Sequence, residues 1–141
     1  MIILDKEIVI QMHKMLIETF GGLYGVRDSN ILESSIESCF QTFDIIELYP
    51  TIEEKGACLG FKLITNHAFT DGNKRIGILA MLTFLEVNDI KVNYTDNDII
   101  KLGYSIAKGE MKYSMVLNWI NRHKTKNVKN ANKIKETTLT K

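Results

Sequence analysis

Apolar residues recur along most of the chain at helical spacing, and these recurrences predict six helices. Five have predicted limits, at about 6–20, 29–39, 52–66, 73–88 and 113–124, and the remaining one begins after Thr95 and carries Ile99, Leu102 and Ile106. Short polar side chains that can cap a helix stand at several of these starts: Asp5, Asp28 or Ser29, Thr51 and Thr95. The pattern is typical of an all-α domain.

The same spacing predicts which face of each helix lies inward. In the first helix it selects Ile8, Met12, Met15, Leu16 and Thr19. His13 lies off this stripe, so we expect a solvated surface residue there. In the sixth helix the spacing selects Met115, Val116, Trp119 and Ile120. The fourth differs, because Ile78 to Leu85 is apolar nearly all round, as in a helix surrounded by core. We therefore predict a compact six-helix fold with a central buried helix.

Two connections break the helical pattern. Residues 40–49 are β-branched and aromatic and stop at Pro50, the only proline, which predicts an extended or hairpin-like flap. Residues 21–28 hold three glycines in five positions, which fits a compact turn or a backbone that approaches a ligand closely. After residue 124 bulky apolar residues are few, so we expect one domain over 1–124 and a basic, disordered tail over 125–141.

Charge is unevenly distributed. The 141 residues carry a net charge of +1, but the last seventeen hold five lysines against one glutamate. Residues 1–124 therefore have thirteen Lys and Arg against sixteen Asp and Glu, which argues against a nucleic-acid-binding face. The two cysteines, Cys39 and Cys58, show no metal-ligand spacing and read as reduced thiols. The sequence shows neither a signal-peptide pattern nor an apolar run of the ~20 residues that a membrane span needs. We expect a soluble, cytoplasmic protein.

Candidate chemistry is concentrated between His67 and Gly77, where a polar stretch leads into the central helix. A helix N-terminus offers unpaired N–H groups and the positive end of the helix dipole, which favours a phosphate. Phosphoryl or nucleotidyl transfer also needs a metal ion and a base for the attacking hydroxyl. The candidates are Gly72, Asn73, Lys74 and Arg75 for the phosphates, Asp71 for Mg²⁺, and His67 for the base. Asn73 could instead fix the loop itself, and Phe69 is expected to anchor the loop in the core.

Other interpretations of the stretch remain open. Asp71 and Asn73 could be helix caps, Lys74 and Arg75 a solvated first turn, and a lone histidine is more often structural than catalytic. However, two cations at a helix N-terminus oppose the dipole unless an anion joins them, which favours the phosphate site. Zinc hydrolysis and acyl transfer fit less well, because the sequence contains neither HExxH nor GxSxG.

The stretch resembles the signature of the Fic/Doc family, HxFx(D/E)GNxR. Six positions match: His67, Phe69, Asp71, Gly72, Asn73 and Arg75. The chain further resembles the death-on-curing (Doc) toxins of that family in residues 21–28 and 109–110, so the resemblance covers about 1–124. It implies the Fic/Doc fold, His67 as the base, Asp71 as the Mg²⁺ ligand and residues 72–75 as the phosphate cradle. It also implies that the flap near 43–49 docks a target segment by strand addition.

Two departures from the pattern bear on the reaction. Typical Fic adenylyltransferases have glycine at the position of Lys74 and arginine at that of Ile78. A lysine fills space that the triphosphate would use, and the missing arginine removes a phosphate contact. Doc toxins share the lysine, and the resemblance to them implies a kinase that moves a phosphoryl group from ATP to a Ser or Thr of translation elongation factor Tu.

The resemblance also implies a cognate Phd-like antitoxin that inhibits the toxin, since the chain has no convincing (S/T)xxxE(G/N) inhibitory helix of its own. Two alternatives remain. One is a Fic-type protein adenylyltransferase, which would transfer AMP. The other is a non-catalytic helical module that binds only a partner.

Overall fold

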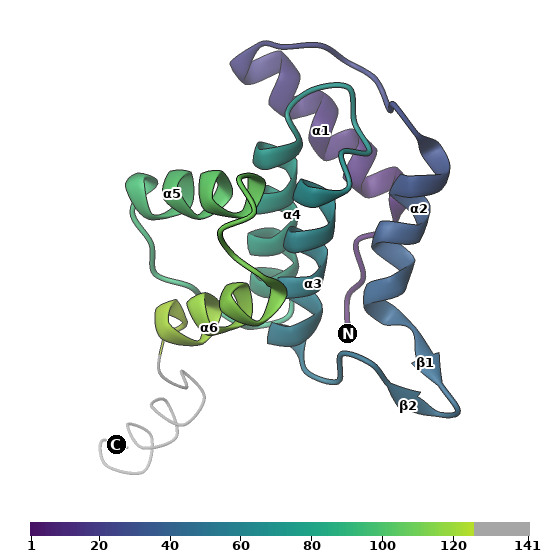
Figure 1. The fold of residues 1–141 in the computed structure, drawn as a ribbon, viewed down its shortest axis with the longest axis vertical. Helices are drawn as coiled ribbons and strands as arrows, with labels where there is room; N and C mark the ends of the chain where they lie inside the picture. Colours follow the sequence, from purple (N-terminus) through teal and green to yellow (C-terminus); the bar gives the residue numbers. More distant parts are fainter. Residues whose placement is uncertain (126–141) are drawn as a thin grey trace, which may run out of the picture.

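The computed structural model describes residues 1–125, which form six α-helices, one 3₁₀ turn and one small hairpin (Figure 1). In chain order the elements are α1 (Lys6–Phe20), α2 (Ser29–Glu37), η1 (Ser38–Phe40), β1 (Thr42–Phe43), β2 (Ile46–Glu47), α3 (Ile52–Thr65), α4 (Asn73–Val87), α5 (Asp96–Ala107) and α6 (Tyr113–His123). The predicted all-α, six-helix fold is confirmed. The predicted tail lies outside the described residues, except for Thr125.

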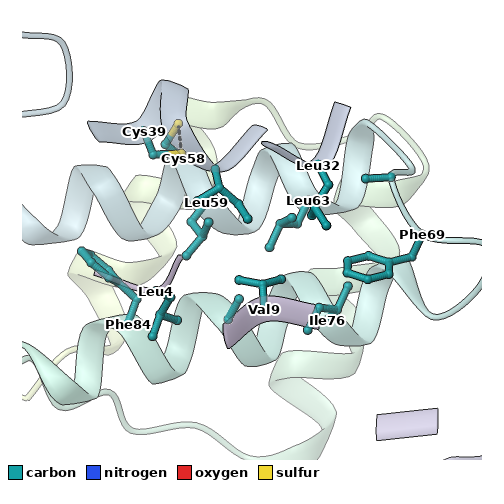
Figure 2. Packing of buried hydrophobic residues seen from close by; sticks show 13 residues of the cluster. Leu4, Val9, Leu32, Cys39, Cys58, Leu59, Leu63, Phe69, Ile76 and Phe84 are labelled. Atoms are coloured by element: carbon teal, nitrogen blue, oxygen red, sulfur yellow. Dashed lines mark hydrogen bonds between the residues drawn. The ribbon is translucent and has the colours of Figure 1, made fainter. Parts of the chain in front are cut away.

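Helix α4 is the centre of the fold, as its composition predicted. On one side it packs against α1, α2 and α3 through a core that includes Val9, Leu32, Leu63, Phe69, Ile76 and Phe84 (Figure 2). On the other side it packs against α3, α5 and α6 through a core that includes Ile64, Met81, Leu102, Ile106, Trp119 and Ile120. Because both sides of α4 are covered, the residues at its N-terminus have fixed positions relative to the five other helices.

Glycines bring α3 and α4 into close contact. A Cβ atom added at Gly77 of α4 would lie 2.4 Å from Cγ1 of Ile64 and 3.0 Å from the carbonyl oxygen of Gly60. One added at Gly60 of α3 would lie 3.0 Å from Cβ of Met81. Contacts this short leave no room for a side chain, so the two backbones touch along this seam. This close packing fixes the C-terminus of α3 and the N-terminus of α4, which the intervening loop joins.

Several helices begin at a capping side chain, as predicted. Asp5 accepts a hydrogen bond from the N–H of Ile8, and Asp28 from that of Ile31. Thr51 caps α3, and Thr95 forms a capping box at the start of α5. Helices α4 and α6 lack a capping side chain, and the N-cap residue of α4 is Gly72, in a left-handed conformation (φ 73°).

The inward face predicted for α1 is only partly right, because Met12 and Leu16 pack half-buried against the core but the most buried positions lie one residue further along the chain. The buried residues of α1 are Val9, His13 and Ile17, whereas Ile8 is 42% exposed and Met15 is 65% exposed. The true stripe has the spacing i, i+4, i+8, but its middle member is a histidine, so a count of apolar residues assigns the face to the neighbouring positions. On α6 the prediction fails only at Met115, which is exposed.

The predicted flap is a two-stranded antiparallel hairpin in which Thr42 pairs with Glu47 and Phe43 with Ile46. The buried ammonium group of Lys55 anchors it by donating hydrogen bonds to the Glu47 carboxylate (3.1 Å) and to the carbonyl of Tyr49. The hairpin precedes the N-terminus of α3, while His67 follows its C-terminus (Figure 1). Fourteen residues of helix, about 21 Å, separate these two ends.

Two further sequence expectations concern the cysteines and the membrane. Cys39 and Cys58 are free and buried, with their Sγ atoms 2.7 Å apart between η1 and the middle of α3 (Figure 2). Among residues 1–125, no helix combines the length and the apolar character that crossing a membrane requires.

Candidate functional site

Residues 66–72, called the His67 loop below, join α3 to α4 and contain the candidate base. His67 is exposed and has a φ of 50°, in the left-handed region that residues other than glycine seldom adopt. Arg27 holds this conformation from outside: its Nε donates to the carbonyl oxygen of His67 (2.7 Å), and its Nη2 to that of Asn66 (3.3 Å). A strained residue held in this way by its surroundings is typical of functional sites.

The glycine-rich segment, residues 21–28, lies directly against the His67 loop. Three backbone hydrogen bonds join the two, from Thr70 N to Gly25 O, from Arg27 N to Ala68 O and from Asp28 N to Ala68 O, and the first two form an antiparallel bridge between Val26 and Phe69. The segment is therefore more than a turn between helices. It pairs with the loop like a short strand, and its contacts fall on both sides of Phe69.

The Asp71 carboxylate is held at both oxygens. Oδ2 accepts a hydrogen bond from the N–H of Leu23 (3.0 Å), and Oδ1 from that of Gly72 (2.8 Å). These N–H groups hold the pKa of the carboxyl below its usual range, with smaller contributions from the charges of His13 and Arg75. Asp71 is exposed, so the result is an ionised carboxylate that faces solvent in one fixed orientation.

The Asn73 side chain fixes the loop from within. Its Oδ1 accepts from the N–H of Phe69 (3.1 Å), and its Nδ2 donates to the carbonyl oxygen of the same residue (3.0 Å). The Phe69 ring is buried, as expected from the sequence. Of the two roles considered for the Asn73 side chain, the geometry favours fixing the loop. A contribution of Asn73 to phosphate binding would then come from its backbone N–H.

The first turn of α4 presents donors and cations together. The first intrahelical hydrogen bond runs from Ile76 N to Gly72 O (2.9 Å), so the N–H groups of Asn73, Lys74 and Arg75 precede the helical ladder. The two cations diverge from this turn. The guanidinium carbon of Arg75 lies 4.8 Å from the centre of the Phe20 ring, and Nζ of Lys74 lies 5.6 Å from that of Tyr104. Positive charge therefore flanks the helix end on two sides.

The donor set decides which metal could fit. Among residues 1–125, no group of three or more His, Cys, Asp or Glu side chains is arranged to hold a metal ion. Asp71 is thus a single carboxylate beside a helix end suited to phosphate. This set fits Mg²⁺, which commonly binds through one or two carboxylates together with phosphate oxygens and water. It does not fit zinc, which needs three or four protein ligands.

One residue of this region was misread from the sequence. His13 of α1 is 3% exposed, its ring stacks on Phe69 with centroids 4.0 Å apart, and its Nε2 lies 2.7 Å from the carbonyl oxygen of Asp71. The sequence did contain an indication that His13 is buried, because it lies four residues from both Val9 and Ile17, which are on the buried face of α1.

The site residues predicted from the sequence all lie in the His67 loop and the first turn of α4. Gly72, Asn73, Lys74 and Arg75 form the cap and first turn of α4, Asp71 directly precedes them, and His67 stands at the other end of the loop. The hairpin, in contrast, lies at the far end of α3 (Figure 1).

Comparison with known proteins gives three matches. The model of the Fic/DOC family matches residues 3–85. A protein named Toxin Doc from Mycolicibacterium smegmatis is 35% identical over 89 residues, which cover 63% of this chain and 66% of that relative. A protein named Protein kinase doc from Escherichia phage P1 is 26% identical over 128 residues, which cover 84% of this chain and 93% of the relative. The family match includes the whole His67 loop and all but two residues of α4.

Proposed function

The chain belongs to the Fic/DOC family and is similar to its Doc members, and from this premise we propose that it is a Doc-type toxin that phosphorylates a protein. It would transfer a phosphoryl group from ATP to a Ser or Thr hydroxyl. The observation that carries the proposal is the start of α4, where Lys74 and Arg75 flank a helix end with no capping side chain and Asp71 is fixed beside it. The printed name of the phage P1 relative, Protein kinase doc, supports phosphoryl over AMP transfer.

Each residue has a distinct part in the proposed reaction. The N–H groups of the first turn of α4 would donate to phosphate oxygens, and Lys74 and Arg75 would neutralise their charge. Asp71 would hold Mg²⁺, which when bound neutralises phosphate charge. His67 would accept the proton of the target hydroxyl as that oxygen attacks the γ-phosphorus of ATP, while the bond from this phosphorus to the β,γ-bridging oxygen breaks and ADP leaves. The fixed Asp71 carboxylate and the fixed His67 backbone supply the orientation that such a reaction depends on.

We propose a different position for the target segment from the hairpin position that the resemblance implies. A strand added to the hairpin would be separated from His67 by the length of α3, whereas residues 21–28 pair directly with the His67 loop. We therefore place the hydroxyl-bearing segment of the target along residues 21–28. By the same resemblance, the target would be translation elongation factor Tu, and a Phd-like antitoxin would restrain the activity.

Intact-mass analysis of purified elongation factor Tu, after incubation with this protein, ATP and Mg²⁺, tests the proposal. We expect the mass of one phosphate to be added, and none with His67→Ala. Addition of AMP instead would move the protein to the adenylyltransferases. A wild-type chain that transfers nothing and does not arrest growth would support the non-catalytic module.

A further inference from the structure

His13 stands apart from the proposed chemistry, yet both of its contacts lead to the His67 loop. It sits on the buried face of α1, and its ring stacks almost parallel (13°) on the Phe69 ring. On its edge, Nε2 lies 2.7 Å from the carbonyl oxygen of Asp71, a residue 58 positions along the chain. A carbonyl oxygen only accepts hydrogen bonds, so Nε2 carries the proton and donates.

This hydrogen bond has a consequence for the next residue. The carbonyl of Asp71 and the N–H of Gly72 belong to one planar trans peptide, so they point in opposite directions. When His13 holds the carbonyl toward α1, the N–H of Gly72 must face away from α1. There it donates to Oδ1 of Asp71 (2.8 Å), while the N–H of Leu23 holds Oδ2 (3.0 Å).

No other described side chain holds this peptide from the α1 side. Asn73 fixes the backbone of Phe69, and Arg27 fixes the carbonyls of Asn66 and His67. Among residues 1–125, His13 is the only residue of α1 whose side chain forms a hydrogen bond with the backbone between Phe69 and α4.

We propose that His13 is a positioning residue that orients the Asp71–Gly72 peptide, and through the N–H of Gly72 the Asp71 carboxylate that stands beside the phosphate cradle. It acts through these groups and touches neither nucleotide nor target. The inference rests on the proposed function for its effect on transfer, but the orientation of the peptide can be tested without any activity.

Two substitutions separate the hydrogen bond from the packing. His13→Phe keeps a ring that can stack on Phe69 but has no donor. His13→Gln loses the ring but carries an amide N–H₂ that can reach the position of Nε2. We expect His13→Phe to remain folded, to lower the transfer rate by about 10- to 100-fold, as losses of supporting partners around a ligand commonly do, and to raise the Mg²⁺ concentration needed. His13→Gln should recover most of the lost rate.

His123 provides a matched control. Its ring also stacks on an aromatic side chain, that of Trp119 (4.0 Å), and its Nδ1 also lies within hydrogen-bond distance of a backbone carbonyl oxygen, that of Trp119 (2.8 Å). It lies at the end of α6, away from the His67 loop. His123→Phe should therefore leave the transfer rate unchanged.

An NMR measurement tests the orientation directly. In wild-type protein, the ¹H–¹⁵N spectrum should show His13 protonated at Nε2, and the amide signal of Gly72 should shift in His13→Phe and return toward its wild-type position in His13→Gln. ATP with Mg²⁺ should then bind more weakly to His13→Phe than to His13→Gln.

The proposal is overturned if His13→Phe keeps both the Gly72 signal and the transfer rate. It is also overturned if His13→Gln is folded but as impaired as His13→Phe, since packing alone would then explain the loss. If His13→Phe does not fold, the His13→Gln comparison decides. If wild-type protein transfers nothing, the proposed function fails, and the Gly72 signal still decides the role of His13.

Discussion

The two ends of α3 carry connections that are held in opposite ways. At the C-terminal end, the His67 loop receives hydrogen bonds from α1, from residues 21–28 and from α4, over separations of up to 58 positions. At the N-terminal end, the hairpin is anchored mainly by Lys55, eight positions from Glu47, and it exposes Phe43, Ile45, Ile46 and Leu48. The candidate site therefore lies at the His67 loop, where segments far apart in the sequence are hydrogen-bonded together, and not at the hairpin with its exposed apolar side chains.

Asn73→Ala should have the largest effect, because it removes the internal support of the His67 loop. Both backbone groups of Phe69 lose their partner, and the first turn of α4 loses its fixed relation to the loop. We expect transfer to fall by about 100-fold or more, and the free energy of unfolding by about 1–3 kcal/mol. Transfer assays and urea unfolding measure the two quantities.

Asn88 is the control for this substitution, because its side chain binds both backbone groups of Ile2 in the same manner at the other end of α4. Asn88→Ala should lower stability to a similar extent but leave transfer intact. Equal losses of transfer in both variants would mean that general stability, and not the loop, limits activity.

Gly22→Ala should disturb Asp71 from the side of residues 21–28. A Cβ atom there would lie 2.7 Å from Oδ2 of Asp71, whereas one at Gly109, between α5 and α6, would meet no atom within 4 Å. Both glycines have positive φ, so both substitutions carry a backbone strain of about 1–3 kcal/mol. Only Gly22→Ala should also lower transfer, by about 10- to 100-fold. Similar transfer rates in the two variants would show that the position of Asp71 is unimportant.

Lys55→Met should act on the hairpin alone. Methionine replaces the buried stem of the lysine with an apolar chain of similar length, and Glu47 is exposed enough to stay solvated, so the free energy of unfolding should fall by about 1–3 kcal/mol for the lost hydrogen bonds. Amide hydrogen exchange over residues 42–49 should become faster, because the bonds to Glu47 and Tyr49 are lost. Transfer should stay within about threefold of wild type. A large loss of transfer would show that the hairpin takes part after all.

Ile45→Gly should have the smallest effect, and in the stabilising direction. Ile45 is 96% exposed and has a φ of 61°, a conformation that strains a β-branched residue but not glycine. Relief of this strain should outweigh the larger loss of backbone entropy that glycine undergoes on folding. We therefore expect the free energy of unfolding to rise by about 0.5 kcal/mol. Ile46→Gly, in the adjoining strand, should destabilise instead. A loss in both variants would indicate that the Ile45 side chain has packing partners.

The predictable parts of this molecule are those whose causes are local in sequence. Asp5, Thr51 and Thr95 cap helices within three residues of themselves, and the apolar run after Ile78 specifies the buried helix. The hairpin follows from β-branched and aromatic residues before Pro50. These features could be read directly from the order of residues.

The contacts that shape the candidate site could not be predicted in this way. The face of α1 was misjudged because His13 is buried through partners in a loop far along the chain, which no spacing rule includes. Residues 21–28 offered two readings, and only the fold shows that their partner is the His67 loop. The sequence motif predicts the residues of the candidate site, whereas the contacts that hold these residues in position depend on the completed tertiary structure.

The separations of these contacts also bear on the order in which the chain folds. The bond pair between Asn73 and Phe69 spans four positions, and α3 and α4 can close over a short connection, so this part can form early at little entropic cost. The bonds from Arg27, Leu23 and His13 span 40, 48 and 58 positions, and they require α1 to have docked. A chain in which α1 had not docked would therefore contain the loop without these orienting bonds, and the proposed activity would require α1 to be in place.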